Sequence, residues 1–266
     1  MSTLSTIHPR QALFGSEPLP PALPVCDHYS GVEARMRKSL MLQAEMAEAG
    51  HGRAVFDVTL DLEDGAPVGG EHEQALQVAE LIDSPQNVCD RVGVRVHDPR
   101  HRRFEDDVDT LIKLAGPRLA YIMVPKLADA ADTQRAIDTI KAARIRHGVE
   151  RVVPVHGLIE TLKAVQQVDE IAALLSFGLM DFVSEHRGAI PATGMSVTGQ
   201  FSHPLVMQAK LKIAAACHAA RLTPSHCVVT EFKDKRALGK AAERACRELG
   251  YTRMWSIHPD QIPVSI

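Results

Sequence analysis

The segment VVPVHGLIETLKAV, residues 152–165, joins a β-rich apolar run to an amphipathic stretch. This change of pattern predicts a buried strand that passes directly into a helix. Glu160 stands at the junction. Helix physics alone offers one explanation, because the partial positive charge at a helix N-terminus favours an acid in the first turn by about 0.3–1 kcal/mol. A functional role for Glu160 therefore requires support from the rest of the chain.

The same strand–helix unit recurs along the sequence. We expect eight strands, at residues 22–29, 54–62, 91–97, 120–126, 152–159, 174–183, 226–232 and 253–259. Amphipathic stretches follow the first seven, at residues 32–49, 73–82, 104–115, 130–147, 162–173, 204–221 and 233–249. Buried strands alternating with helices imply a parallel sheet, and eight such units imply an α/β fold of the closed (β/α)8 TIM-barrel type. We expect the helix after the eighth strand to be missing or shortened.

Composition supports one large domain preceded by a short arm. The chain has 266 residues, of which 45% are hydrophobic, and this is sufficient for a single large core. Residues 1–21 contain several prolines and no periodicity, so we expect an extended N-terminal arm before a barrel catalytic domain at residues 22–266.

Charge and cysteine usage exclude several classes of partner. The formal net charge of -3 comes without clustered Lys and Arg, which argues against a nucleic-acid partner. The five cysteines are widely spaced and form no CxxC pair, which argues against disulfides and zinc. No apolar run is long enough to cross a membrane, and no signal peptide is evident. We therefore expect a soluble, cytoplasmic protein without a membrane partner.

Polar side chains collect where the expected strands end, and active sites of TIM barrels are built at these carboxyl ends. Each of these residues has an ordinary structural explanation, such as a helix N-cap or a turn residue, but their convergence on one rim is harder to explain in that way. Carboxylates from adjacent strands, without cysteine, suit a hard divalent cation such as Mg²⁺, with Mn²⁺ as the alternative. The set comprises Asp61, Glu63, Asp64, Arg95, His97, Lys126, His156, Glu160 and Asp181.

These stretches also resemble a known family. LDLEDG, the VRV strand, the PK pair, LIET, FGLMD and WSIHPDQI occur in an order and spacing similar to the HpcH/HpaI aldolase and citrate lyase β-subunit family, from about Ala54 to Ile262. The resemblance implies that Glu160 and Asp181 hold Mg²⁺ and that Arg95 contacts a carboxylate or enolate oxygen of the substrate. It also places Glu63 and Asp64 near the metal and its waters.

The resemblance implies a lyase or aldolase that breaks or makes a carbon–carbon bond beside a carbonyl, through a metal-stabilised enolate. The substrate is then a small carboxylic acid or its thioester, with coenzyme A or an acyl carrier as the thiol. We count Arg95, Glu63 and Asp64 as candidate catalytic residues, and Arg95, Lys126 and His258 as candidate substrate-binding residues. The base that removes the hydroxyl proton stays open among His97, His156, His258 and a metal-bound water.

Other features separate this chain from the family pattern. The first strand lacks the usual PG turn, although Arg35, Arg37 and Lys38 follow it, either as an anion site or as a solvated helix face. Residues 186–203 form a long loop that is either a lid or an ordinary connection. The alternative function is a non-catalytic or partner-dependent barrel. A shortened end would also expose the outer face of the eighth strand, which predicts a homo-oligomer that covers it.

Overall fold

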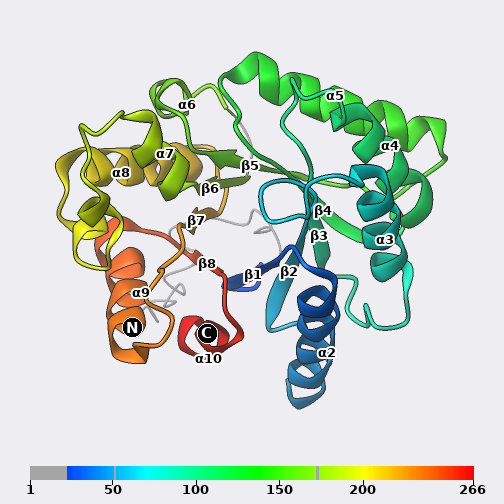
Figure 1. Ribbon diagram of the computed structural model, residues 1–266, viewed down its shortest axis with the longest axis horizontal. Helices are drawn as coiled ribbons and strands as arrows, with labels where there is room; N and C mark the ends of the chain where they lie inside the picture. The colour runs from blue at the N-terminus through cyan, green and yellow to red at the C-terminus, as the bar shows by residue number, and fades with distance from the viewer. Residues whose placement is uncertain (1–22, 51, 172–173) are drawn as a thin grey trace, which may run out of the picture.

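The computed structural model describes residues 23–50, 52–171 and 174–266, so the expected N-terminal arm lies outside the described residues. Eight parallel strands form a closed barrel in the order of the chain, as Figure 1 shows. The strands are β1 Cys26–Ser30, β2 Phe56–Asp61, β3 Val92–Arg95, β4 Leu119–Val124, β5 Val155–Ile159, β6 Leu174–Phe177, β7 Pro224–His226 and β8 Arg253–Ser256. The α/β barrel predicted from the sequence is confirmed.

Helices surround this barrel and cover the outer faces of its strands (Figure 1). They are α2 Glu33–Ala49, α3 Glu71–Asp83, α4 Phe104–Ala115, α5 Ala130–Arg146, α6 Leu162–Gln166, α7 Leu179–Glu185, α8 Pro204–Ala219, α9 Lys235–Leu249 and α10 Ile262–Ser265. Short 3-10 turns are η1 Ala192–Met195, η2 Gly199–Phe201 and η3 Pro259–Gln261. No helix in the described part of the chain is sufficiently long and apolar to cross a membrane.

The periodicity of the helices explains how they pack. In α4 the buried side chains include Phe104, Val108, Leu111 and Ala115, spaced three or four residues apart, so one face lies against the sheet. β2 is buried along its whole length, as expected for a strand covered on both sides. The largest apolar cluster of the described residues therefore lies between the sheet and the helices, and two smaller clusters lie beside it.

A cluster of buried charge lies inside the barrel near the starts of the strands. We call it the base cluster: Asp27, Asp57, Arg91 and Arg253. Arg253 lies 2.6 Å from Asp57 and 3.3 Å from Asp27, while Arg91 binds both oxygens of Asp57 at 2.6 Å. Two arginines thus balance two aspartates.

Two neutral hydroxyl groups donate hydrogen bonds to Asp27 Oδ1 inside the barrel. Thr59 Oγ1 donates to Asp27 at 2.7 Å and Tyr121 Oη donates to it at 2.9 Å. The Tyr121 ring crosses the barrel above Gly93, where a Cβ atom would come within 2.2 Å of the ring. Position 93 therefore accepts glycine alone as long as Tyr121 keeps this position.

Two expected strands differ from the structure. The seventh was expected at residues 226–232, but β7 ends at His226. The apolar residues Val228 and Val229 are buried without strand pairing, and Val229 O accepts from Gln261 Nε2 at 2.6 Å. The sixth strand was expected to run to residue 183, but helix α7 begins at Leu179. Apolar content alone did not distinguish strand from buried loop or helix.

The outer face of β8 is buried, which contradicts the expectation of an exposed surface there. The C-terminal helix is short, as expected, since α10 has 4 residues. However, Met254 is 5% exposed and packs in one cluster with Leu238 and Ala241 of α9, and Val264 of α10 packs against the same cluster. The helix that precedes β8 thus covers this face together with α10. This removes the structural reason that we gave for a homo-oligomer.

Candidate active site

A buried arginine–aspartate pair holds the mouth of the barrel at the ends of β2 and β3. Arg95 Nε and Nη2 each donate to one oxygen of Asp61 at 2.7 Å, and Asp61 is fully buried. The backbone N–H groups of Glu63 and Gly65 and the Tyr29 hydroxyl also donate to Asp61. Because its two oxygens accept from every side, Asp61 fixes the orientation of the guanidinium group.

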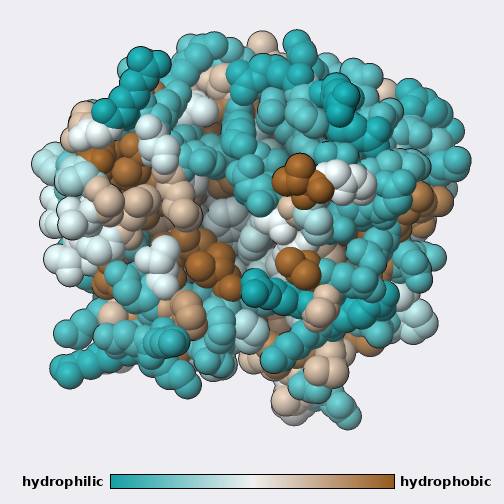
Figure 2. Space-filling view, viewed as in Figure 1, coloured by the Kyte–Doolittle hydropathy of each residue, from teal (hydrophilic) through white to brown (hydrophobic). Residues whose placement is uncertain are grey.

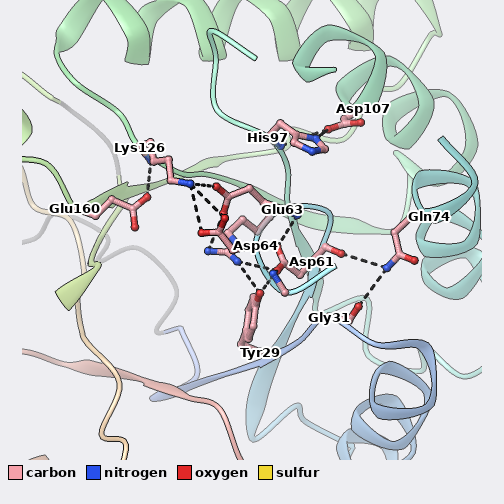
Figure 3. A network of polar contacts seen from close by, with 12 residues as sticks. Tyr29, Gly31, Asp61, Glu63, Asp64, Gln74, His97, Asp107, Lys126 and Glu160 are labelled. Carbon is pink, nitrogen blue, oxygen red and sulfur yellow. Dashed lines mark hydrogen bonds and ion pairs between the residues drawn. The ribbon is translucent and has the colours of Figure 1, made fainter. Parts of the chain in front are cut away.

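Two further acids on the β2–α3 loop surround a lysine (Figure 3). Lys126 Nζ forms a short ion pair with Glu63 and lies 3.4 Å from Asp64. Glu63 Oε2 lies 3.1 Å from Arg95 Nη1, although the geometry is not that of a hydrogen bond. Glu63 therefore stands between the two cations of the mouth, while Asp64 is largely exposed.

Glu160 and Asp181 form a carboxylate pair at the ends of β5 and β6. Glu160 is 3% exposed, and its Oε1 accepts the backbone N–H of Lys126 at 2.7 Å. Asp181 lies in the first turn of α7 and lines the same cavity as Glu160. Gly178 leaves the space for Glu160, because a Cβ atom there would lie 2.5 Å from Glu160 Oε2.

Burial and crowding of acids shift the pKa values of this site. The pKa of Glu160 lies well above its ordinary value, first because burial disfavours the charged form and then because Asp181 hydrogen-bonds to it and repels it. Burial also raises the pKa of Glu63, against the opposing effect of Arg95. A cation bound beside Glu160 would favour its ionised form.

The donor set at Glu160 and Asp181 fits a hard divalent cation. Mg²⁺ is commonly bound by one or two carboxylates and keeps several of its waters. Within the described residues no group of three or more His, Cys, Asp and Glu side chains is arranged to hold a metal. A two-carboxylate site completed by water and substrate is therefore what these residues could offer.

These groups open into a cavity of about 270 Å³ at the barrel mouth, below the range of about 300–1,000 Å³ that is usual for small-molecule sites. Arg95, Glu160, Asp181 and Asp64 line it together with apolar residues of β5, α7, β8 and the loop after β7. Figure 2 shows a hollow near the centre of this face. The size favours a small ligand.

Other candidate residues lie outside the cavity lining. His258 caps η3, where its ring accepts the backbone N–H of Asp260, and it stacks on Phe232. His97 is held 2.6 Å from the buried Asp107, as Figure 3 shows. His156 is fully buried 2.7 Å from Ser176 Oγ.

The basic residues after β1 lie on the exposed face of α2. Arg35, Arg37 and Lys38 are all exposed, and Arg37 pairs with Glu33 one turn earlier in the helix at 2.9 Å. Arg37 and Lys38 also line a cavity of about 880 Å³ on this side of α2, so the anion site and the solvated helix face both stay predictions.

Two residues of the mouth were not singled out from the sequence. Tyr29 receives a hydrogen bond from Arg95 Nη2 at 2.7 Å, and Trp255 of β8 packs against the Tyr29 ring with 5.5 Å between ring centroids. Asp61 was noted only as a polar strand end. Strand alternation could have found Trp255, because it places residues 253 and 255 on the same inner face.

Comparisons with known proteins agree with this geometry. Residues 41–259 match the model of the HpcH/HpaI aldolase/citrate lyase family. The chain is 26% identical over 273 residues to the L-malyl-CoA/beta-methylmalyl-CoA lyase of Cereibacter sphaeroides, covering 95% of this chain and 81% of that protein.

Solved structures show the same fold. A citrate lyase from Burkholderia xenovorans LB400 superposes with a TM-score of 0.87 at 48% identity, covering 92% of this chain and 76% of the other. The citrate lyase beta subunit of M. tuberculosis, complexed with oxaloacetate and magnesium, superposes with a TM-score of 0.67 at 22% identity, covering 92% of this chain and 96% of the other.

Proposed function

Because the chain belongs to the HpcH/HpaI aldolase/citrate lyase family and is a carbon–carbon lyase of that family, we propose that it cleaves or forms a bond beside a carbonyl in a small carboxylic acid or its thioester, with Mg²⁺ as cofactor. Mn²⁺ is the alternative ion. The malyl-CoA lyases and the magnesium-containing citrate lyase beta subunit to which the chain is similar support this choice.

The observation that carries the proposal is the excess of carboxylates at the barrel mouth. We define the mouth cluster as Asp61, Glu63, Asp64, Arg95, Lys126, Glu160 and Asp181. Five carboxylates face two cations in this cluster, and the two least compensated acids are the neighbours Glu160 and Asp181. A divalent cation would offset that excess of negative charge and favour the ionised form of Glu160.

In the proposed mechanism Glu160 and Asp181 hold the cation, and Arg95 binds the oxygen on which negative charge develops. When bound, Mg²⁺ supplies Lewis-acid stabilisation of charge on a carbonyl oxygen. Arg95 adds a fixed charge that needs no reorganisation, because Asp61 already orients it. Arg95 and Glu160 are themselves buried at the floor of the cavity, which strengthens this electrostatic effect.

The remaining candidate residues receive supporting roles. We propose that Glu63 and Asp64 orient Lys126, and that their carboxylates would accept hydrogen bonds from water bound to a cation at Glu160 and Asp181. Lys126 then offers its ammonium group to a substrate carboxylate. His258 is the neighbour of Ile257, which lines the cavity, and its ring caps η3. We propose that the ring contacts substrate only if it turns toward the cavity when substrate binds.

Two measurements test this proposal. Calorimetry should show Mg²⁺ binding to the wild type and none to Glu160→Gln or Asp181→Asn, since both replacements keep the shape of the side chain and remove a charge. A screen of 2-oxo acids, aldehydes and acyl thioesters with Mg²⁺, followed by mass spectrometry, should detect carbon–carbon bond cleavage or formation.

The two variants also separate the alternatives. Wild-type metal affinity in both would overturn the metal assignment and leave Glu160 as a buried acid that accepts the backbone N–H of Lys126. Normal Mg²⁺ binding without turnover of any substrate would instead favour a barrel that depends on a partner chain or an acyl carrier.

A further inference from the structure

The lining of the cavity is polar on one side of the barrel and apolar on the other. The acids and Arg95 come from the ends of β3, β5 and β6 and from the β2–α3 loop. On the other side stand Val228, Trp255 and Ile257, which we call the apolar wall. Figure 2 shows brown, apolar side chains beside the hollow where β7 and β8 end in Figure 1.

The apolar wall is rigidly supported. Trp255 and Val228 are each 8% exposed and pack with the buried Leu158 and Met123 below them. The Tyr29 ring, which Arg95 holds by a hydrogen bond, packs against the indole. A ligand at the cation would therefore meet the indole as a fixed surface.

The apolar wall offers no partner for a charged group. Arg95 is the sole cation among the described residues that line the cavity, and its charge is already shared with Asp61 and Glu63. Lys126, which we assign to the carboxylate end of the substrate, belongs to the acidic side with Glu63 and Asp64 and is not part of the apolar wall. A second free carboxylate placed against Trp255 would lose its hydration without gaining an ion pair, which is costly. An alkyl group at the same place would bury apolar surface on both partners.

We propose that Trp255 is the specificity-determining residue of this site and that the site takes a monoanionic substrate with an uncharged, apolar substituent against the indole. This inference rests on the proposed function, because it needs the carboxylate end of the substrate to lie at Glu160, Asp181 and Arg95. The Nε1 atom of Trp255 is buried without a hydrogen-bond partner among the described residues, so the indole acts on the substrate through its shape and its apolar face.

A matched pair of ligands tests the inference by binding alone. Oxaloacetate and 2-oxo-4-methylpentanoate have side chains of the same branched shape, ending in a carboxylate and in two methyl groups respectively. With Mg²⁺ present, calorimetry should show at least tenfold tighter binding of the methyl-bearing acid. Trp255 is the sole tryptophan of the chain, so the same titration should change the intrinsic fluorescence.

Two variants then separate shape from hydrogen bonding. Trp255→Ala should lose the tenfold preference, while Trp255→Phe, which keeps an apolar ring and lacks the N–H group, should retain it. Tighter binding of oxaloacetate to the wild type, unchanged fluorescence on saturation, or loss of the preference in Trp255→Phe would each overturn the inference. Failure of the proposed function would look different, because the wild type would then bind no Mg²⁺.

Discussion

The barrel holds two clusters of buried charge that are built from similar residues but differ in their balance. In the base cluster Arg91 and Arg253 neutralise Asp27 and Asp57 within hydrogen-bonding distance. In the mouth cluster Arg95 has an equally close aspartate partner, yet the acids outnumber the cations. In the base two arginines balance two aspartates, whereas the excess of acids in the mouth would be balanced by a further positive charge.

The two clusters also differ in how far their side chains are exposed to solvent. The side chains of Arg253 and Asp57 are each 1% exposed, and two hydroxyl groups inside the barrel donate to Asp27. The side chains of Lys126 and Asp64 are 33% and 57% exposed and adjoin a cavity. Buried charge of similar strength is thus structural where it is paired and closed, and available for chemistry where it is unbalanced and open.

The strongest test of this difference is a loss of stability at the base. Arg253→Met leaves Asp27 and Asp57 short of a partner, and breaking a buried ion pair in this way costs about 3–5 kcal/mol. Urea denaturation should show this loss in the free energy of unfolding. Asp181→Asn should be at least as stable as the wild type in the absence of metal, because it relieves repulsion. Equal losses in the two variants would remove the distinction between the clusters.

The second test adds the missing charge. Mg²⁺ at a hundred times its dissociation constant should raise the free energy of unfolding of the wild type by about 2.7 kcal/mol. Arg253→Met should gain the same amount, since distant sites contribute independently. Glu160→Gln should gain nothing. Thermal denaturation with and without Mg²⁺ measures all three, and a missing gain in Arg253→Met would show that the clusters are coupled.

The third test compares the two arginines by the same replacement. Arg95→Lys should lower turnover roughly tenfold, equivalent to about 1.4 kcal/mol, and leave Mg²⁺ affinity nearly unchanged. A lysine cannot reproduce the two-pronged contact of a guanidinium group. Arg91→Lys at the base should leave turnover unchanged. If Arg95→Lys instead abolishes Mg²⁺ binding while turnover per bound metal stays normal, Arg95 only holds the acids in place.

The smallest expected effect concerns pH and Glu160. Its raised pKa means that the metal-free folded protein binds a proton that the unfolded chain releases. The stability that this proton gives the folded protein is fully present below the pKa of Glu160 in the unfolded chain. It is lost as the pH rises through the pKa of Glu160 in the folded protein. The difference in unfolding free energy between the wild type and Glu160→Gln should therefore shift against the wild type as the pH rises. Saturating Mg²⁺ should reverse that trend, and a difference independent of pH would contradict the shift.

The fold was largely predictable because its signals are local. Strand and helix patterns alternate in order, and α4 begins and ends at the residues expected from periodicity. The exceptions, β7 and α7, involve apolar segments that are buried without forming the expected strand. Their burial depends on Gln261 and on the lining of the mouth, and neither is visible in the local pattern.

The candidate site was predictable to the level of strand ends. Glu63, Lys126, Glu160 and Asp181 do lie around one mouth. The pairing among them was not predictable, because Asp61 and not Glu63 makes the bidentate contact with Arg95. Which acid pairs with Arg95 depends on the direction and reach of each side chain. Moving one residue along a strand reverses that direction.

The ion pair between Arg253 and Asp57 also joins the last strand of the chain to the second. The two residues are 196 positions apart in the sequence. At a synthesis rate of about 5–20 residues per second, a ribosome completes Arg253 about 10–40 s after Asp57. Throughout that interval β1 has no neighbour on its β8 side. Asp27 and Asp57 then lack Arg253, one of the two arginines that balance their charge. The newly made chain therefore passes through an open, acid-lined half-barrel, and a chaperone that shields this edge would act before the enzyme exists as a barrel.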